Sequence, residues 1–353
     1  MSTSKNIAFV HDWLTGIGGD VRVLKALHEM YPTAPIYCLY QNKKFTSEFL
    51  PQAHIIPSFS RGFKAVKLYG STAIESLDLS AYDLVISTGS IFSKGIIVRP
   101  KTYHINYCHS PTRQVWDLSH DYRHKIFQHF LRIWDRNVST RVDKYVANSE
   151  NVRTRIKKYY QRDAEVVYPP VGSESGIMNY ELGSDRNSQF LIPNSFLIVS
   201  RLYKHKNIDI AIRAFNKLGW NLIIIGDGPE RARLERLAGP TVRLLGSVSD
   251  DTCYMIRDSC LAFILPQEED FGIAPIEAMM HGKPVLALRR GGALEYIQEG
   301  INGLFFDDAH EAVLADGVRR LSQNLPRYNT EIIKKTAERF SASRFKKEIL
   351  NFL

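Results

Sequence analysis

Short apolar runs recur along the chain, and each is followed by a polar or glycine-containing turn and then by a segment with helical spacing. Apolar runs of this kind are typical of strands buried in a parallel sheet, and their alternation with helical segments indicates βαβ units. No fixed-period repeat occurs, which excludes a solenoid. The runs that we interpret as strands lie at 6–10, 34–40, 82–88, 102–108 and 143–149, and then at 195–200, 221–225, 242–245, 260–266 and 283–288.

Helical spacing predicts helices at 21–30 and 208–218. Pro275 is suited to the first position of a further helix, because its missing N–H would have no partner there. Ser341 is a candidate N-cap for a terminal amphipathic helix. From Tyr122 onward a longer amphipathic helix is expected, and we interpret its apolar stripe as core. That stripe consists of Phe127, Phe130, Leu131, Trp134 and Val138.

The chain of 353 residues exceeds one ordinary domain, and the α/β pattern restarts at 195. Residues 173–194 are rich in Ser, Gly and Asn without a clear period, so we interpret them as a linker. Two α/β halves with glycine turns at strand ends predict two facing Rossmann-like domains that bind a ligand between them.

Composition limits the classes of function. Hydrophobic residues make up 44% of the chain, which is enough for two cores, and the net charge of +9 favours an anionic partner. Nucleic acid, anionic lipid and a phosphorylated substrate all meet this criterion. The four cysteines show neither metal-ligand spacing nor a disulfide framework, so a reducing cytosol is expected. No apolar run approaches the length of a membrane span, and we expect no signal peptide.

Two features of the first half are candidates for chemistry. Gly16, Gly18 and Gly19 follow the first strand and can expose backbone N–H groups to a ligand, although a structural turn is an equal alternative. The spacing is not that of a dinucleotide-binding loop, and Gln41 ends the next strand where an acid would be needed, so a dehydrogenase is disfavoured. His109 follows another strand and can bind a hydroxyl or phosphate, or serve structurally.

The stretch 54–70 mixes basic and aromatic side chains. It includes Arg61, Lys64 and Lys67 together with Phe59, Phe63 and Tyr69. Such a mixture suits a membrane surface or an acceptor loop, and an amphipathic helix packed on the sheet is the alternative.

The second half carries the more specific pattern. Arg201 and Lys206 bracket the turn after a strand, as an anion clamp would require. Glu269 lies in the loop after the strand at 260–266, and Glu277 lies in the first turn of the predicted helix. Two carboxylates around a helix start can hold a polyhydroxylated ligand while the helix start holds an anion. Alternatively, Glu277 only complements the helix dipole.

These residues, together with the GDGPE motif at 226–230 and the LGSV motif at 245–248, resemble the C-terminal domain of glycosyltransferase family four. The VHDWLTGIGGD and YCHSP motifs resemble the same family, particularly bacterial transferases of capsule, exopolysaccharide and O-antigen assembly. The resemblance covers nearly the whole chain. It implies a GT-B fold with an interdomain cleft, an acceptor-binding domain at 1–172, the linker 173–194, a nucleotide-sugar-binding domain at 195–339, and a terminal helix, 340–353, that packs back on the first domain.

The resemblance also implies roles for individual residues. Glu269 would contact the hydroxyls of the donor sugar and Glu277 the ribose, while Arg201 and Lys206 would hold the diphosphate. His109 would lie beside the reacting sugar, which completes a catalytic set of Glu269, His109, Arg201 and Lys206. The remaining donor-binding positions are Gly18 and Gly19, the backbone of Gly246, Ser247 and Val248 toward the base, and the N–H groups of Phe271, Gly272 and Ile273. Asp20 departs from the Glu that many relatives carry, which concerns the acceptor or loop geometry.

The implied function is a retaining transfer of a hexose from a nucleotide sugar, with GDP-mannose named first, without cofactor or metal ion. The acceptor would be a glycan or a polyprenyl-diphosphate-linked sugar, reached in the cytoplasm at the inner face of the membrane. The stretch 54–70 would then attach the protein to anionic lipid. The alternatives are a UDP-sugar-dependent transferase, a sugar phosphorylase, and a non-catalytic binder of membrane or nucleic acid. Against nucleic acid, the basic residues are spread along the chain and no RNA-binding motif is visible.

Metal independence is testable. The chain has no D-x-D motif, and cations with a helix start can stabilise a departing diphosphate instead. We expect nucleotide-sugar turnover by the purified protein to be unchanged by EDTA. Loss of turnover in EDTA, restored by a divalent cation, would contradict this prediction.

Overall fold

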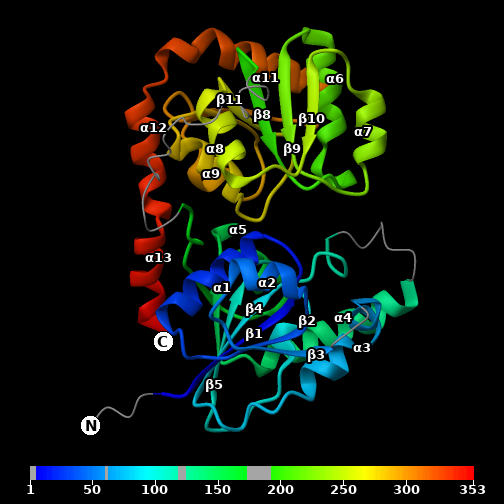
Figure 1. Ribbon diagram of the computed structural model, residues 1–353, viewed down its shortest axis with the longest axis vertical. Coiled ribbons are helices and arrows are strands. Elements are labelled where there is room, and N and C mark those ends of the chain that lie inside the picture. The colour runs from blue at the N-terminus through cyan, green and yellow to red at the C-terminus, as the bar shows by residue number, and fades with distance from the viewer. Residues whose placement is uncertain (1–4, 60–62, 118–124, 173–191) are drawn as a thin grey trace. The chain divides into compact units, whose positions relative to one another are not determined.

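The structure, a computed structural model, describes residues 5–59, 63–117, 125–172 and 192–353 (Figure 1). The side chains of residues 63–65, 67 and 68 are outside this description. The chain divides into two compact units. Unit 1 comprises residues 1–170 and 342–353, and unit 2 comprises residues 171–341. Most of the expected linker lies outside the described residues.

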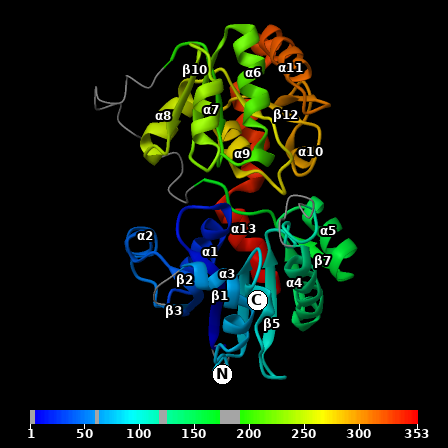
Figure 2. The same cartoon turned by 90° about the vertical axis from the view of Figure 1, so that its right-hand side faces the viewer.

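Unit 1 is built on a seven-stranded parallel sheet with the order β3-β2-β1-β4-β5-β6-β7 (Figures 1 and 2). Its strands are β1 (Ile7–Leu14), β2 (Ile36–Gln41), β3 (Ile55–Phe59), β4 (Leu84–Gly89), β5 (Tyr103–Cys108), β6 (Lys144–Ala147) and β7 (Ala164–Val166). Its helices are α1 (Gly19–Met30), α2 (Lys43–Phe49), α3 (Phe63–Glu75), α4 (Lys125–Val138), α5 (Glu150–Tyr160) and α13 (Ala342–Ile349), with 3₁₀ turns η1 (Ser93–Gly95), η3 (Ser139–Arg141) and η8 (Leu350–Phe352).

The strands of unit 1 are apolar on both faces because helices cover both. On β1, Phe9 packs in a cluster with Leu24 of α1 and Phe345 of α13. The next residue, Val10, points to the other face and packs in a cluster with Val66 of α3. Trp134 of α4 packs against this cluster. The alternation of side chains along a strand produces these two separate cores.

Unit 2 is built on a six-stranded parallel sheet with the order β10-β9-β8-β11-β12-β13. Its strands are β8 (Ser195–Val199), β9 (Asn221–Ile225), β10 (Val242–Gly246), β11 (Ala262–Leu265), β12 (Val285–Leu288) and β13 (Gly303–Phe306). Its helices are α6 (Ile208–Leu218), α7 (Arg231–Leu237), α8 (Asp250–Ser259), α9 (Ile273–Met280), α10 (Ala293–Tyr296), α11 (Glu311–Asn324) and α12 (Thr330–Ala337), with 3₁₀ turns η5 (Lys204–Lys206), η6 (Leu325–Arg327) and η7 (Glu338–Phe340).

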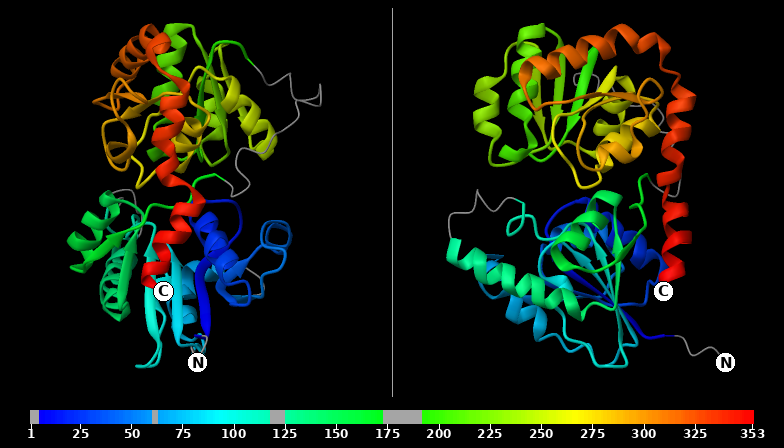
Figure 3. Two further views of the ribbon diagram at one scale, coloured as in Figure 1. Left: turned by 90° about the vertical axis from the view of Figure 1, so that its left-hand side faces the viewer. Right: turned by 180° about the vertical axis from the view of Figure 1, so that it is seen from behind.

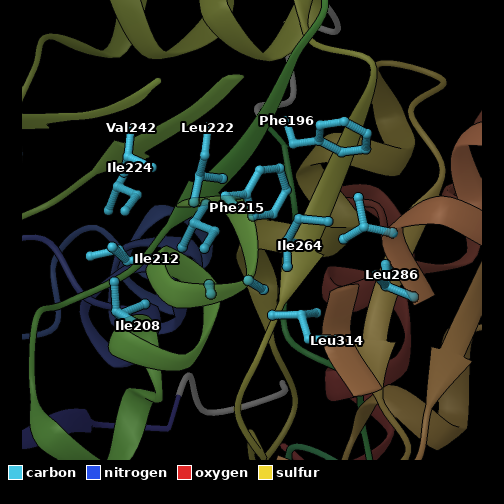
Figure 4. Close-up of a cluster of buried hydrophobic side chains, with 14 of the residues drawn as sticks. Phe196, Ile208, Ile212, Phe215, Leu222, Ile224, Val242, Ile264, Leu286 and Leu314 are labelled. Carbon is cyan, nitrogen blue, oxygen red and sulfur yellow. The ribbon is translucent and has the colours of Figure 1, made fainter. Parts of the chain in front are cut away.

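The main core of unit 2 lies between this sheet and α6 with α11. Phe196 of β8 and Phe215 of α6 meet edge to face with ring centroids 5.3 Å apart (Figure 4). Leu314 of α11 and Leu286 of β12 continue the cluster. In both sheets the strand order reverses beside the first strand of the unit, between β1 and β4 and between β8 and β11. Ligands of open α/β sheets bind outside the carboxyl ends of the strands at such a reversal.

The C-terminal segment packs on unit 1 (Figure 3). Phe345 of α13 is fully buried against Tyr107 of β5, with ring centroids 5.9 Å apart. Arg344 donates to the Tyr168 carbonyl at 2.8 Å, and the Lys346 ammonium lies 2.9 Å from the Glu29 carboxylate of α1. Residues 342–353 are therefore a structural part of the N-terminal fold, although all of unit 2 separates them from residues 1–170 in the sequence.

The predicted core stripe of α4 is wrong in part. Val138 is buried and Trp134 is partly buried, as expected. Phe127 and Phe130, however, are 41% and 65% exposed, whereas Asp135 is buried. Asp135 points inward because Lys94, Thr112 and Trp116 bind its carboxylate. Helical spacing alone does not reveal which of two stripes faces the core.

Two other expectations need adjustment. The stretch 54–70 contains a strand, β3, and the greater part of α3, so both the helical alternative and a strand occur in it. Residues 60–62 and the side chains of Lys64 and Lys67 lie outside the described residues, which leaves the proposed lipid contacts there as a prediction.

The helix expected at Pro275 begins two residues earlier, at Ile273, because Gly272 with φ of +97° makes the turn into it.

Gly226 permits a close approach of two loops in unit 2. It has φ of +130°, and a Cβ atom there would lie 2.0 Å from the Ser200 carbonyl oxygen. We expect Gly226→Ala to lower the free energy of unfolding of unit 2 by about 3 kcal/mol, since the backbone has to move apart. Gly219 at the end of α6 also has positive φ but has no atom within 4 Å of a built Cβ. Gly219→Ala should therefore cost about 1 kcal/mol for its backbone conformation alone. Equal midpoints for the two variants in urea unfolding would contradict this account.

Candidate active site

The carboxyl ends of β8, β9 and β10 carry loops that are tied together through the backbone. Leu202 donates to the Asp227 carbonyl at 2.8 Å, and Glu230 donates to the Leu202 carbonyl at 3.0 Å. Gly226 donates to the Gly246 carbonyl at 2.8 Å. This interlocking fixes the turn that presents the candidate cations Arg201 and Lys206.

Lys206 and Glu269 are direct partners. The Lys206 ammonium lies 2.6 Å from Oε1 of Glu269, and Gln267 donates to the same oxygen at 2.8 Å. The side chains of Lys206 and Glu269 are 7% and 22% exposed. Asn207 donates to the Pro266 carbonyl at 3.2 Å and so joins the two loops. The carboxylate is thus held in one orientation, and the charge of the buried ammonium is compensated.

The loop around Glu269 leaves no room for larger residues nearby. The Glu269 carbonyl accepts a hydrogen bond from Gly292 at 2.9 Å, and a Cβ atom on Gly291 would lie 2.3 Å from that carbonyl oxygen. Phe271 turns its ring inward, with ring centroids 5.5 Å from Phe340 and 6.0 Å from Tyr296. The inward ring anchors the backbone that leads into α9.

Glu277 on α9 forms an ion pair that sequence reasoning missed. Its Oε2 lies 2.7 Å from Nη2 of Arg257 on α8, and the two side chains are 13% and 11% exposed. The sequence-based alternative, in which Glu277 only complements the helix dipole, did not include an ion pair with Arg257. Arg257 lies 20 residues away in the sequence, and no local spacing marks the pair.

Arg201 differs from Lys206 in its surroundings. It is exposed, its guanidinium lies 5.7 Å from the centre of the Tyr203 ring, and it has no ion pair among the described residues. Gly246 is buried with φ of +73°, Ser247 is exposed and Val248 is partly buried. Of the two predicted cations, Arg201 therefore remains available to an anionic ligand.

In unit 1, His109 lies where β4 and β5 end. Thr88 and the imidazole Nε2 of His109 are hydrogen-bonded at 2.7 Å, and the His109 carbonyl accepts from Asn148 at 3.0 Å. Burial lowers the pKa of His109 to about 4, against the opposing negative charge of Asp20. The ring is consequently neutral near pH 7. Because the unfolded state would hold a proton up to about pH 6.5, this group reduces stability as the pH falls from there toward 4.

The glycine loop and Asp20 lie at the start of α1. Gly18 is the N-cap residue and Gly19 the first helical residue. One Asp20 oxygen accepts from the Val21 N–H at 3.0 Å, and the other lies 3.7 Å from Nε2 of the buried His11. Asp20 thus reaches the end of β1, beside the position of His109.

Asp12 is a structural carboxylate that sequence reasoning also missed. It is buried, and its two oxygens accept hydrogen bonds from the backbone N–H groups of Ser90, Ile91, Phe92 and Ser93 at 2.6 to 2.8 Å. The predicted first strand ended at Val10, whereas β1 continues to Leu14 and includes Asp12. The acid close to the end of a predicted strand was the sequence signal that could have revealed this role. Through its four hydrogen bonds, Asp12 fixes the loop that follows Thr88 and the end of β4.

Within the described residues, no group of three or more His, Cys, Asp or Glu side chains is arranged to hold a metal ion. Of the helices in the described ranges, none combines the length and apolar character needed to cross a membrane.

Comparison with known proteins identifies the family. Residues 185–339 match the family described as glycosyl transferases group 1. The alpha-1,3/1,6-mannosyltransferase ALG2 of Candida glabrata is 29% identical over 205 residues, which are 44% of this chain and 44% of that protein. Residues 185–339, which make up most of unit 2, therefore form a glycosyltransferase domain of this family.

Solved structures agree in fold. Anabaena HepE, in a complex with UDP and glucose, has a TM-score of 0.75 and 17% identity over 99% of both chains. WaaG, a glycosyltransferase involved in lipopolysaccharide biosynthesis, has a TM-score of 0.73 and 14% identity over 98% of this chain and 99% of that one. The fold is therefore GT-B, as predicted. The matched part spans about half the length of the first curated relatives.

Within the matched domain, the structure brings Lys206 and Glu269 into contact and pairs Glu277 with Arg257. Arg201 lies at the same sheet edge, over the Tyr203 ring and without an ion pair among the described residues. Gly18, Gly19 and His109 lie at the carboxyl edge of the other sheet. Apart from Glu277, which lies in the middle of α9, the predicted residues are found at strand ends or helix starts, and the ligand-binding roles remain predictions.

The Lys206–Glu269 pair can be tested by its effect on stability. Lys206→Met leaves the Glu269 carboxylate without its cation, and we expect a loss of about 1–3 kcal/mol in the unfolding free energy of unit 2, allowing for the partial exposure of Glu269. Lys204→Met in the same turn removes an exposed ammonium and is the matched control. Chemical unfolding should leave the control unchanged within error. An equally small effect for both variants would contradict a structural role for the pair.

Proposed function

We propose that the protein transfers a hexose from a nucleotide sugar to an acceptor, with retention of the anomeric configuration and without a metal ion. The observation that carries this proposal is the Glu269 carboxylate held by Lys206 and Gln267 on the sheet edge that also presents Arg201. The fixed carboxylate can accept hydrogen bonds from the hydroxyls of a sugar, and the available cation can bind the diphosphate attached to it.

In this proposal, Glu269 accepts hydrogen bonds from the sugar hydroxyls, and Lys206 and Gln267, which both donate to its Oε1, hold the carboxylate in place. Arg201 contacts the diphosphate, on which negative charge grows as the sugar–phosphate bond breaks. The N–H groups at the start of α9 and the Lys206 charge add to that stabilisation. Preorganised charges of this kind need no metal ion.

Arg257 orients Glu277 toward the ribose. Arg257 donates to Oε2 of Glu277 at 2.7 Å and so fixes the carboxylate that would accept from a ribose hydroxyl. The loop that contains Gly246, Ser247 and Val248 would face the base. A buried ion pair near the ribose fixes the carboxylate more firmly than an exposed side chain could be fixed.

In the chemical step, the bond between the anomeric carbon and the phosphate oxygen breaks, and a bond to the acceptor oxygen forms on the same face. The acceptor proton passes to the departing phosphate oxygen. His109, neutral near pH 7, would contribute a hydrogen bond to the reacting sugar rather than a positive charge. The resemblance to family four, and not a nucleophile at this site, supports the front-face route.

The sugar and the acceptor are the finer part of the proposal. Mannose from GDP-mannose comes first because the curated relative is a mannosyltransferase. A UDP-sugar is the alternative, since the HepE structure contains UDP and glucose. The involvement of WaaG in lipopolysaccharide biosynthesis supports a glycan or polyprenyl-diphosphate-linked acceptor at the inner face of a membrane. A sugar phosphorylase remains a second candidate, and its turnover would depend on inorganic phosphate.

The proposal predicts release of a nucleoside diphosphate from one member of a panel of GDP-, UDP-, ADP- and dTDP-sugars, assayed with and without short lipid-linked glycans. Glu269→Gln should lower this turnover about 100-fold or more, because a neutral amide cannot accept equally well from the sugar. Glu268→Gln changes an exposed neighbouring acid and serves as the matched control. Undiminished turnover in Glu269→Gln, or turnover that requires phosphate, would count against the proposal.

A further inference from the structure

The helix α4 turns its large apolar side chains outward. Ile126, Phe130 and Ile133 are 77%, 65% and 45% exposed, and Phe127 beside them is 41% exposed. Positions 126, 130 and 133 recur at helical spacing, so these side chains form one continuous stripe. We call these four residues the outer face of α4. Scattered exposed apolar residues are ordinary, but a stripe on one helix marks a contact surface.

The orientation of α4 is fixed by polar contacts on its inner side. Asp135 is fully buried, and its carboxylate lies 2.6 Å from the Lys94 ammonium and accepts from Thr112 at 2.6 Å and Trp116 at 2.8 Å. The buried Gln128 donates to the Gln114 carbonyl at 2.7 Å. Rotating the helix to bury its outer face would break these bonds and leave charges unpaired. The outer face is therefore a property of the native fold.

Basic residues border the outer face. Lys125, His129, Arg132 and Arg136 follow one another at intervals of four, three and four residues, so they lie along one side of the apolar stripe. Asp135 is the single acid of α4, and it is buried and paired with Lys94. Lys125 and His129 are exposed, whereas Arg132 and Arg136 are partly buried and Arg132 donates to the Val115 carbonyl at 2.8 Å. The apolar stripe thus has a basic border. That combination is typical of helices that lie in the plane of an anionic membrane surface.

We propose that the outer face of α4 is the surface by which this protein docks on anionic lipid. A second copy of the chain fits less well, because a two-fold contact would bring the basic borders of two α4 helices together. The adjacent helix α3 extends the surface, since Trp134 of α4 donates to Glu75 of α3 at 3.0 Å and Tyr69 of α3 is 56% exposed (Figures 1 and 3).

This assignment changes which part of the chain is expected to meet the membrane. The sequence prediction placed the membrane contact at 54–70, which includes the start of α3, and this proposal places it on the adjacent helix α4. The proposal rests on the proposed function for its purpose, because a lipid-linked acceptor has to be reached at a membrane. The surface itself rests only on the exposure, polar anchoring and charge of α4.

The test is sedimentation of the full-length protein with vesicles made of equal parts of phosphatidylcholine and phosphatidylglycerol, or of phosphatidylcholine alone. We expect binding to the mixed vesicles that weakens in salt. Ile126→Gln with Phe130→Gln should reduce the partition coefficient at least about tenfold, since these side chains enter the interface. Ile301→Gln with Ile332→Gln removes two exposed apolar residues of unit 2 and is the matched control, expected to bind normally.

Other outcomes are equally informative. Unchanged vesicle binding by the α4 variant would overturn the proposal. Absence of binding by the parent protein would also overturn it, and ultracentrifugation would then show whether self-association depends on the same two residues. Donor turnover without vesicles should be equal in the parent and the α4 variant. A protein that binds vesicles through α4 but turns over no donor would refute the proposed function and leave the docking surface intact.

Discussion

The parallel arrangement of both sheets is the constraint on which the rest of this structure depends. Helices cover both faces of each sheet, so the strands are buried and their side chains are committed to the cores. The strand ends are the part of each sheet that is open to a ligand, and the carboxyl ends carry loops that lead into helix N-termini. Arg201, Glu269 and His109 all follow strands in this way.

Strand ends do not by themselves give a precise site, and buried polar contacts supply that precision. In unit 2, Lys206 and Gln267 hold one oxygen of Glu269, and Arg257 holds one oxygen of Glu277. In unit 1, Asp12 accepts from four consecutive backbone N–H groups and fixes the loop after β4. Leaving a buried charge unpaired at any of these positions would destabilise the fold, so the hydrogen bonds and ion pairs of each network stay formed. Arg201 is exposed and has no ion pair among the described residues, so its charge can bind a ligand without breaking such a network.

Asp135 shows that such a network can also shape a surface. By binding Lys94, Thr112 and Trp116, it draws the polar side of α4 inward and leaves four large apolar side chains exposed. The stability of the buried network thus maintains an apolar face that hydrophobic packing alone would cover. A candidate donor site in unit 2 and a candidate lipid surface in unit 1 then rest on one kind of interaction, a buried polar group with several partners.

The sequence by itself determined the parallel α/β class, the strand-end positions of Arg201, Lys206, Glu269 and His109, and most strands in their order, although it missed β3, β7 and β13. These follow from local periodicity and turn residues, which depend on neighbours in the chain. Helix boundaries were good where a glycine or cap marked them, as at 208–218, and poorer at Pro275. Only the tertiary structure decided that Arg257 meets Glu277, that Asp12 receives the loop after β4, and that α4 faces outward with its phenylalanines. Each of these depends on partners distant in sequence, and a periodic pattern shows that a helix has two faces but not which face the rest of the fold can satisfy.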